Sequence, residues 1–334
     1  MENRDYLAFV IRNLKGVRTT EKISLLSILE KEVGREISVS SLKEIIAGYF
    51  VKNHPLIENA FRKSDEEIKS IERGGIGFVS VFDSGYPFRL KEIYNPPPVL
   101  FYRGNLPESY DKTVAVVGTR FAGGAALGAA YDTGFGLGVN GVSVVSGLAR
   151  GIDREAHLGN MDSGIKGIAV LGNGIDSVYP QENRKLAYRL LDEGGCIFSE
   201  FEPGVRGSRY TFPLRNRIIS GISAAVAVIQ APERSGALIT ADFAAEQGRE
   251  VFIHETGLVS GDGSGGLALC RDGAPCFSSP VELVREMGWE VPVPEYSREA
   301  SGPEEHKLLA ECEIKGTAVC YRGTYFFRKG SVYG

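Results

Sequence analysis

Short apolar runs recur through the middle of the chain, with no regular alternation of polar residues inside them. The runs are Val114–Val117, Val142–Val145, Ile168–Leu171, Cys196–Phe198, Ala224–Ile229 and Val251–Ile253. Such runs suit strands that are buried on both faces, and helix-length segments separate most of them. An alternation of strands with helices favours a parallel sheet covered by helices. The pattern therefore predicts an α/β fold with a doubly wound, mostly parallel sheet over residues 76–289.

The first 75 residues carry apolar positions at helical spacing instead. Ser41 and Glu44 have the spacing of a capping box, which marks the start of a helix. The segment Ser64–Arg73 is expected to form a helix that stops at the glycine pair 74–75. We expect residues 1–75 to form a small helical domain that precedes the sheet.

The segment 290–334 opens with Pro292 and Pro294. A short helix over 306–313 and a hairpin over 321–332 are expected within it. A segment of this length cannot bury an independent core. We therefore predict a short C-terminal tail, which is not an evident winged helix.

The charge balance limits the partners of the chain. Its 38 basic and 42 acidic residues give a formal net charge of −4, so any nucleic-acid contact must come from a local patch. No apolar run approaches the length of a membrane span. The 5 cysteines include no CxxC pair, which favours reduced thiols in a cytoplasmic protein without a metal site or cofactor.

Donor-rich loops follow the predicted strands. They are Gly118-Thr119-Arg120, Ser146–Asp153, Gly172–Asp176 and Ser235–Thr240. The carboxyl ends of parallel strands meet at one edge of a sheet, where ligands bind. Glycine lets backbone N–H groups approach a ligand, and Ser, Thr and Arg add further donors. The loops together predict a cleft that binds an anion.

The segment Phe212–Gly221 supports the same interpretation. Pro213 suits the first turn of a helix, and Arg215 and Arg217 follow it. Cations oppose the helix dipole there unless an anion is bound, and Arg matches the geometry of phosphate. Alternatively, the two arginines point into water or pair with nearby carboxylates such as Glu200.

The sequence does not match three common kinds of enzyme or nucleotide-binding site. No Gly-rich fingerprint opens the helix after the first predicted strand, and no P-loop occurs. Gly261, Gly263 and Gly266 match GxGxxG, but late in the chain, where we expect a flexible loop. Asp153 and His157 share a helix face, and we favour a structural role for both over a catalytic pair.

Taken in order, these loops resemble the DNA-processing protein A family (DprA, also called Smf). The matching stretches include Val116–Arg120, Val145–His157, Ala169–Asp176, Tyr179–Asn183, Phe212–Gly221 and Ser235–Ala241. The resemblance covers residues 76–285. It implies an extended Rossmann-like domain that dimerises, binds single-stranded DNA and hands it to the RecA recombinase during transformation, without catalysis.

The resemblance also implies which residues meet the DNA. The expected set is Gly118, Thr119, Arg120, Gly147, Gly172, Arg215, Asn216, Arg217, Ser235 and Gly236, with Arg184 or Lys185. Of the last two we favour Lys185. Phe121, Tyr210 and Phe212 are candidates for stacking on bases.

Two other classes of function stay open. The first is a nucleotide N-glycosidase of the lysine-decarboxylase-like class, whose motif ends in a catalytic Glu. This chain has Phe243 at that position. The second is a sensor that binds a small nucleotide and signals through the N-terminal helices. A mononucleotide would bind the sensor as well as an oligonucleotide does.

Overall fold

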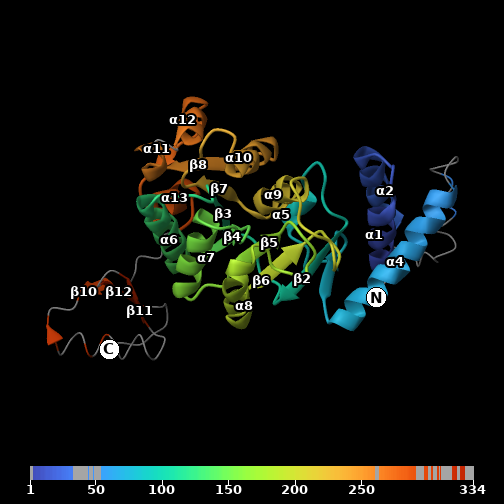
Figure 1. Cartoon of the computed structure of the whole chain (residues 1–334), viewed down its shortest axis with the longest axis horizontal. Helices are drawn as coiled ribbons and strands as arrows, with labels where there is room; N and C mark the ends of the chain where they lie inside the picture. The colour runs from blue at the N-terminus through green and yellow to red at the C-terminus, as the bar shows by residue number, and fades with distance from the viewer. Residues whose placement is uncertain are drawn as a thin grey trace.

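The computed structural model describes residues 3–32, 54–259 and 263–290, with scattered positions outside these ranges, among them 297–299, 318–321 and 324–327. Its centre is a nine-stranded sheet in the order β1-β2-β6-β5-β4-β3-β7-β8-β9 (Figure 1). The strands are β1 (Gly77–Ser80), β2 (Val99–Gly104), β3 (Thr113–Val117), β4 (Ser143–Ser146), β5 (Ile168–Leu171), β6 (Cys196–Ser199), β7 (Ala225–Val228), β8 (Glu250–His254) and β9 (Cys276–Phe277). The pairs from β6 to β9 are parallel, and β1 and β2 are antiparallel additions.

This topology confirms the predicted doubly wound α/β fold. The chain runs outward from β3 through β4, β5 and β6, then returns to pair β7 with the other side of β3. The switch point, where the winding reverses, therefore lies between β3 and β7. In sheets of this kind the ligand crevice lies beyond the carboxyl ends of the strands at the switch point.

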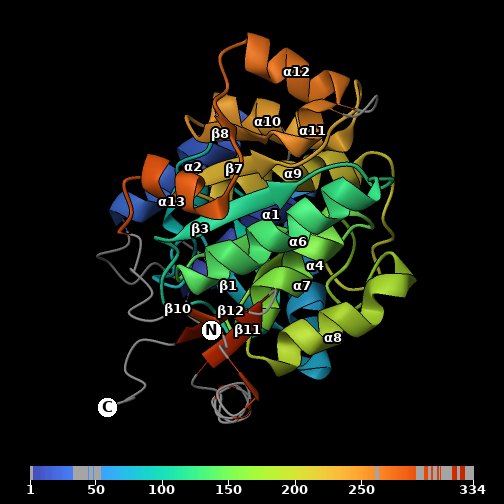
Figure 2. The same cartoon turned by 90° about the vertical axis from the view of Figure 1, so that its left-hand side faces the viewer.

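Helices cover both faces of the sheet. They are α5 (Phe88–Lys91), α6 (Gly124–Val139), α7 (Ile152–Asp162), α8 (Arg184–Asp192), α9 (Thr211–Ile222), α10 (Gly236–Glu246), α11 (Thr256–Val259), α12 (Ser264–Arg271) and α13 (Pro280–Glu286). Side chains of β3 alternate between the faces: Val114 and Val116 pack with α6, α7 and α13, whereas Ala115 and Val117 pack with α9 and α10. Figure 2 shows α6 and α7 side by side in front of β3. The continuous apolar strands are thus buried on both sides.

Three N-terminal helices lie beside β1 and β2: α1 (Asn3–Asn13), α2 (Thr19–Glu32) and α4 (His54–Gly74). The ring of Phe9 contacts Phe78 and Phe101, at centroid distances of 5.1 and 6.1 Å. Helix α4 ends at Gly74, as its sequence predicts. Ser41 lies outside the described residues. The N-terminal helices therefore share a hydrophobic core with the sheet.

Ion pairs also join the N-terminal helices to the loop after β6. Arg12 on α1 pairs with Glu67 and with Glu202, and Lys63 Nζ lies 3.1 Å from Glu202 Oε1. Burial opposes ionisation of Glu202, but Arg12 outweighs it and lowers the pKa to about 2. None of the described helices is long and apolar enough to cross a membrane.

Beyond residue 290, the described strands form a separate three-stranded sheet. Its order is β10 (Ser297–Glu299), β12 (Thr324–Phe327) and β11 (Ala318–Tyr321), and all pairs are antiparallel. The hairpin therefore lies earlier than predicted, because the apolar stretch 318–321 provides its first strand. Of the predicted helix 306–313, only Lys307 and Leu309 fall within the described part, and both are helical.

Candidate functional site

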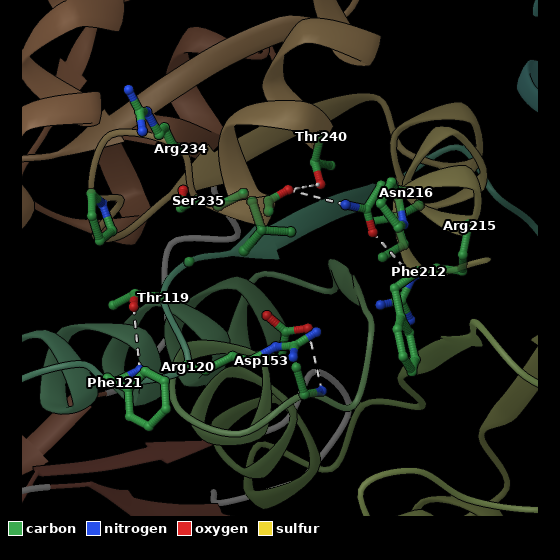
Figure 3. Close-up of a pocket in the computed structure, with 18 of the residues that line it drawn as sticks. Thr119, Arg120, Phe121, Asp153, Phe212, Arg215, Asn216, Arg234, Ser235 and Thr240 are labelled. Atoms are coloured by element: carbon green, nitrogen blue, oxygen red, sulfur yellow. Dashed lines mark hydrogen bonds between the residues drawn. The ribbon is translucent and has the colours of Figure 1, made fainter. Parts of the chain in front are cut away.

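A cavity of about 460 Å³ opens at the switch point. The loops after β3 and β7 form two of its walls, and the beginning of α9 forms the third (Figure 3). Of the predicted residues, it is lined by Gly118, Thr119, Arg120, Arg215, Asn216, Ser235 and Gly236. An adjoining cavity of about 110 Å³ shares Arg120 and Arg215 and adds Gly147. The structure thus brings together residues that lie far apart in the sequence.

Arg215 is a buried cation at the base of the cavity. Its Nη1 donates to the carbonyl oxygen of Gly147 at 3.0 Å and to that of Val170, and its Nε donates to Asn216 Oδ1 at 3.2 Å. Among the described residues, Nη2 has no hydrogen-bond partner. Burial lowers the pKa of Arg215 to about 10, and the nearby Asp153 opposes that shift. The guanidinium stays charged at neutral pH, and an anion in the cavity would stabilise it.

The start of α10 faces the same cavity. Ser235 is the N-cap residue of α10, yet its hydroxyl caps no backbone N–H. Its Oγ is buried and has no hydrogen-bond partner in the described part of the chain. Asn216 Nδ2 donates to the Gly236 carbonyl oxygen at 3.0 Å, which fixes α9 against α10. A buried hydroxyl without a partner beside a helix N-terminus suits an anionic oxygen.

Three arginines around the cavity have no carboxylate partner within the described part of the chain. Arg120 is exposed, and its guanidinium lies over the ring of Phe212, 5.7 Å from the centroid. Arg209 donates to the hydroxyl of Tyr210 at 2.7 Å. Arg234 adopts a left-handed φ of +65°, which costs a non-glycine residue on the order of 1 kcal/mol. Three cations without a carboxylate partner in the described part of the chain therefore surround the cavity, although the chain is acidic overall.

Two predicted glycines serve close packing. A Cβ at Gly147 would lie 2.5 Å from Arg215 Nη2, and a Cβ at Gly172 would lie 2.6 Å from the ring of Phe212. The N–H of Gly147 is also engaged, because it donates to Asp153 Oδ2 at 3.0 Å. Glycine at these positions lets Arg215 and Phe212 approach the strand ends.

The structure places Arg217 outside the cavity. Its side chain is 5% exposed, and its Nη2 lies 2.6 Å from Glu200 Oε1. Residues two apart on a helix point in nearly opposite directions, so Arg215 and Arg217 cannot face the same ligand. Helix α9 also begins at Thr211, so Pro213 stands two residues further into the helix than predicted. Arg217 belongs to a buried ion pair, which was the alternative left open by the sequence.

Arg184 and Lys185 begin α8 and are exposed, but they line neither cavity. Asn183 fixes this end of α8, because its Nδ2 donates to the carbonyl oxygens of Leu148 and Ala149 at 2.9 and 3.0 Å. Ala149 lines both cavities. The start of α8, which carries Lys185, therefore adjoins the loop after β4 that lines the site.

Asp153 and His157 take structural positions. Asp153 Oδ2 accepts from the N–H groups of Gly147 and Ala149, at 3.0 and 3.4 Å, and so shapes the loop before α7. His157 is fully buried beside the Ser146 backbone at the end of β4. Burial lowers the pKa of His157 to about 4, so it is neutral at pH 7.

Two of the late glycines lie at the start of a helix, where a flexible loop was expected. Gly263 precedes α12 and Gly266 lies within it, whereas Gly261 is outside the described residues. The N–H groups of Gly265 and Gly266 donate to the Ala231 carbonyl oxygen at 3.0 and 3.2 Å. Helix α12 thus supports the loop after β7 from outside.

Arg209 and Arg234 also line the cavity, although neither was predicted from the sequence. Arg234 directly precedes the Ser235-Gly236 pair, so its place in the loop after a strand was a usable signal. Arg209 offered none, because the length of the loop before α9 does not fix where its side chain lies.

The fold and the site define a Rossmann-like protein with a cationic cavity at its switch point. The family model described as DNA recombination-mediator protein A matches residues 77–288. The DNA processing protein DprA of Streptococcus pneumoniae is 34% identical over 264 residues, which cover 78% of this chain and 92% of that protein. The chain belongs to the family of DNA recombination-mediator protein A, whose members are named DprA or Smf.

Solved structures agree with this assignment. The X-ray structure of DprA from S. pneumoniae has a TM-score of 0.73 at 31% identity and covers 86% of this chain and 99% of its own. DNA processing protein A from Helicobacter pylori, described for its single-stranded DNA binding mode, has a TM-score of 0.56 at 24% identity. That match covers 64% of this chain and 95% of the other. At this identity it supports the fold alone.

Proposed function

We propose that this chain binds single-stranded DNA across the cavity at the switch point. The observation that carries the proposal is the guanidinium of Arg120, which has no carboxylate partner among the described residues and lines the same cavity as the buried Arg215. The orphan hydroxyl of Ser235 adds a donor at the start of α10. Phosphates that cross these groups would meet two cations and a helix N-terminus. Such contacts bind the backbone and do not distinguish bases.

Aromatic side chains beside these cations support a single strand over a duplex. Phe121 is 81% exposed and Tyr210 is 69% exposed, and both flank the arginines of the site. Tyr179 packs against Phe212, with a centroid distance of 5.4 Å. Unpaired bases can stack on such rings, whereas the bases of a duplex are already stacked. We assign Phe121 and Tyr210 to this role.

The proposed activity is binding without catalysis. Asp153, the buried carboxylate at the cavity, already accepts two backbone hydrogen bonds and lies near Arg215. Phe243 stands on α10, where the nucleotide N-glycosidases carry their catalytic Glu. Four arginines and two carboxylates, those of Asp153 and Glu233, line the cavity, and an excess of cations suits retention of a phosphate backbone.

The family description as a recombination mediator supports two further parts of the proposal. The chain would act as a homodimer in the cytoplasm, and it would pass its bound strand to RecA during transformation or recombination. Both parts follow from the family resemblance.

The direct test is a fluorescence anisotropy titration with a labelled single strand of roughly 20 nucleotides, at two salt concentrations. Duplex DNA and AMP serve as competitors. We expect binding that weakens as the salt concentration rises. Neither duplex DNA nor AMP should displace the labelled strand effectively. Tight competition by AMP would support the sensor or the N-glycosidase instead, and release of a free base from AMP would identify the enzyme.

A further inference from the structure

Two cysteines at the edge of the sheet lie in direct contact. Cys270 is in the last turn of α12, and Cys276 is the first residue of β9. Their sulfur atoms are 3.1 Å apart, roughly 1 Å more than the length of a disulfide bond. Cys276 is exposed and Cys270 is partly buried, so solvent reaches the pair.

A tight reversal of the chain holds the two thiols together. After α12 ends, the N–H of Ala274 donates to the Leu269 carbonyl oxygen at 3.0 Å. The N–H of Gly273 donates to the Cys270 carbonyl oxygen at 3.1 Å. Gly273 has a φ of +102°, which a side chain would disfavour. The backbone therefore fixes the approach of the thiols, and no large movement is needed to join them.

The pair stands at a short edge strand of the sheet. Strand β9 contains two residues and pairs with β8. Cys276 lies opposite Ile253, and Phe277 lies opposite His254. Helix α12 is attached at its other end, where Gly265 and Gly266 donate to the Ala231 carbonyl oxygen. A covalent bond between the thiols would tie the free end of α12 to the sheet edge.

We propose that Cys270 and Cys276 form a reversible disulfide when the protein meets a peroxide. The Cys276 thiol ionises, and its thiolate attacks one peroxide oxygen and becomes a sulfenic acid. The other oxygen leaves as hydroxide, which takes up the proton that the thiol lost and becomes water. The Cys270 sulfur then attacks the sulfenic sulfur, and its proton leaves with the displaced hydroxyl as a second water. Two thiols and one hydrogen peroxide thus yield one disulfide and two waters, and a dithiol reverses the change.

The order of the two steps follows from exposure. Burial, together with the hydrogen bond to Cys276, raises the pKa of Cys270 to about 11. Cys270 is therefore a thiol at neutral pH, and the exposed Cys276 reacts first. Cys196 gives an internal contrast, because it is 1% exposed and burial raises its pKa far above the ordinary range.

Trypsin provides a sharp test, because Arg271 lies between the two cysteines. Cleavage separates residues 250–271 from residues 272–285, each with one cysteine. The reduced full chain is treated with one equivalent of hydrogen peroxide, alkylated, digested and analysed by mass spectrometry. We expect the two peptides to be linked, at about 2 Da below their summed mass, and to separate after dithiothreitol.

The Cys276→Ser and Cys270→Ser variants are the matched controls. Neither should form the link, and Cys270 in the first should remain open to alkylation. Peroxide should raise the melting temperature of the parent chain by about 2–4 °C and leave that of both variants unchanged. Sulfinic or sulfonic acid on Cys276 without a link, or two alkylated thiols after treatment, would overturn the proposal.

Discussion

The guanidinium of Arg215 rests against the backbone of Gly147. Arg215 Nη1 donates to the Gly147 carbonyl oxygen at 3.0 Å, and a Cβ on Gly147 would lie 2.5 Å from Nη2. The loop after β4 and the helix after β6 thereby form one unit at the edge of the sheet. The position of the buried cation depends on the absence of a side chain at residue 147.

Replacing Gly147 with Ala should therefore displace Arg215. The added methyl group occupies the place of the guanidinium, and we expect a loss of about 1–3 kcal/mol in the free energy of unfolding. Affinity for single-stranded DNA should fall in the folded variant as well. Gly128→Ala is the control, because nothing lies within 4 Å of its Cβ position and Ala favours the helix interior. Denaturant titration and anisotropy measure the two effects, and an unchanged Gly147→Ala protein would refute the packing argument.

Arg217 should affect stability and leave DNA binding unchanged. Its pairing with Glu200 is largely buried, so Arg217→Met leaves a carboxylate without its partner. We expect a loss of about 3–5 kcal/mol in the free energy of unfolding. The double variant Arg217→Met/Glu200→Gln should recover part of this loss. If the folded double variant binds DNA more weakly than the parent chain, Arg217 contacts the strand after all.

His157 should make stability depend on pH. Burial lowers its pKa from 6.5 to about 4, so between these values the unfolded chain takes up a proton that the folded chain refuses. The free energy of unfolding should fall by up to about 3 kcal/mol as the pH drops from 6.5 to 4. Glu202, with its pKa lowered to about 2, loses its contribution only below pH 4.5.

The variant His157→Leu isolates this effect. Denaturant midpoints measured from pH 7 to pH 4 should slope less in the variant than in the parent chain. Equal slopes would mean that other groups cause the pH dependence.

Lys185 and Arg184 should differ in their effect on binding. Arg184 Nη2 donates to the Tyr188 hydroxyl at 3.2 Å and its guanidinium lies over that ring, whereas Lys185 is exposed with no partner among the described residues. Lys185→Ala should lower the affinity for single-stranded DNA by about fivefold in 0.1 M salt, the effect of one phosphate contact. Arg184→Ala should have less effect, and the reverse order in anisotropy titrations would reassign the contact.

Strands β3 to β8 could be predicted because their apolar runs record burial on both faces, and each lies within a residue or so of its expected bounds. Strands β1, β2 and β9, at the two edges of the sheet, were not predicted. The parallel arrangement of these strands was then enough to predict that the loops meet at one edge of the sheet. The start of α9 could not be placed in this way. Ser208 and Thr211 exchange hydrogen bonds, and these begin the helix before Pro213. The prediction placed the start at Pro213 because proline favours the first turn of a helix.

The directions of the side chains on α9 were also predicted incorrectly, and this error concerned the site more directly. Arg215 and Arg217 were assigned to one ligand, although helical geometry separates neighbours at this spacing. The tertiary partner of Arg217, Glu200, was visible in the sequence only as one of two nearby acids. By contrast, a structural role for Asp153 was anticipated, although its carboxylate accepts from the loop before α7 and does not cap that helix.

The most direct test of the account is the salt dependence of binding in Arg120→Ala. The slope of log K against log salt should be less steep than that of the parent chain by about 0.7, the value for one phosphate contact on a single strand. Affinity should fall alike on all base sequences. Arg154→Ala is the control, because Arg154 is half-exposed, pairs with Glu155 and does not line the cavity. An Arg120→Ala slope equal to that of the parent chain and of Arg154→Ala would show that DNA does not cross this cavity.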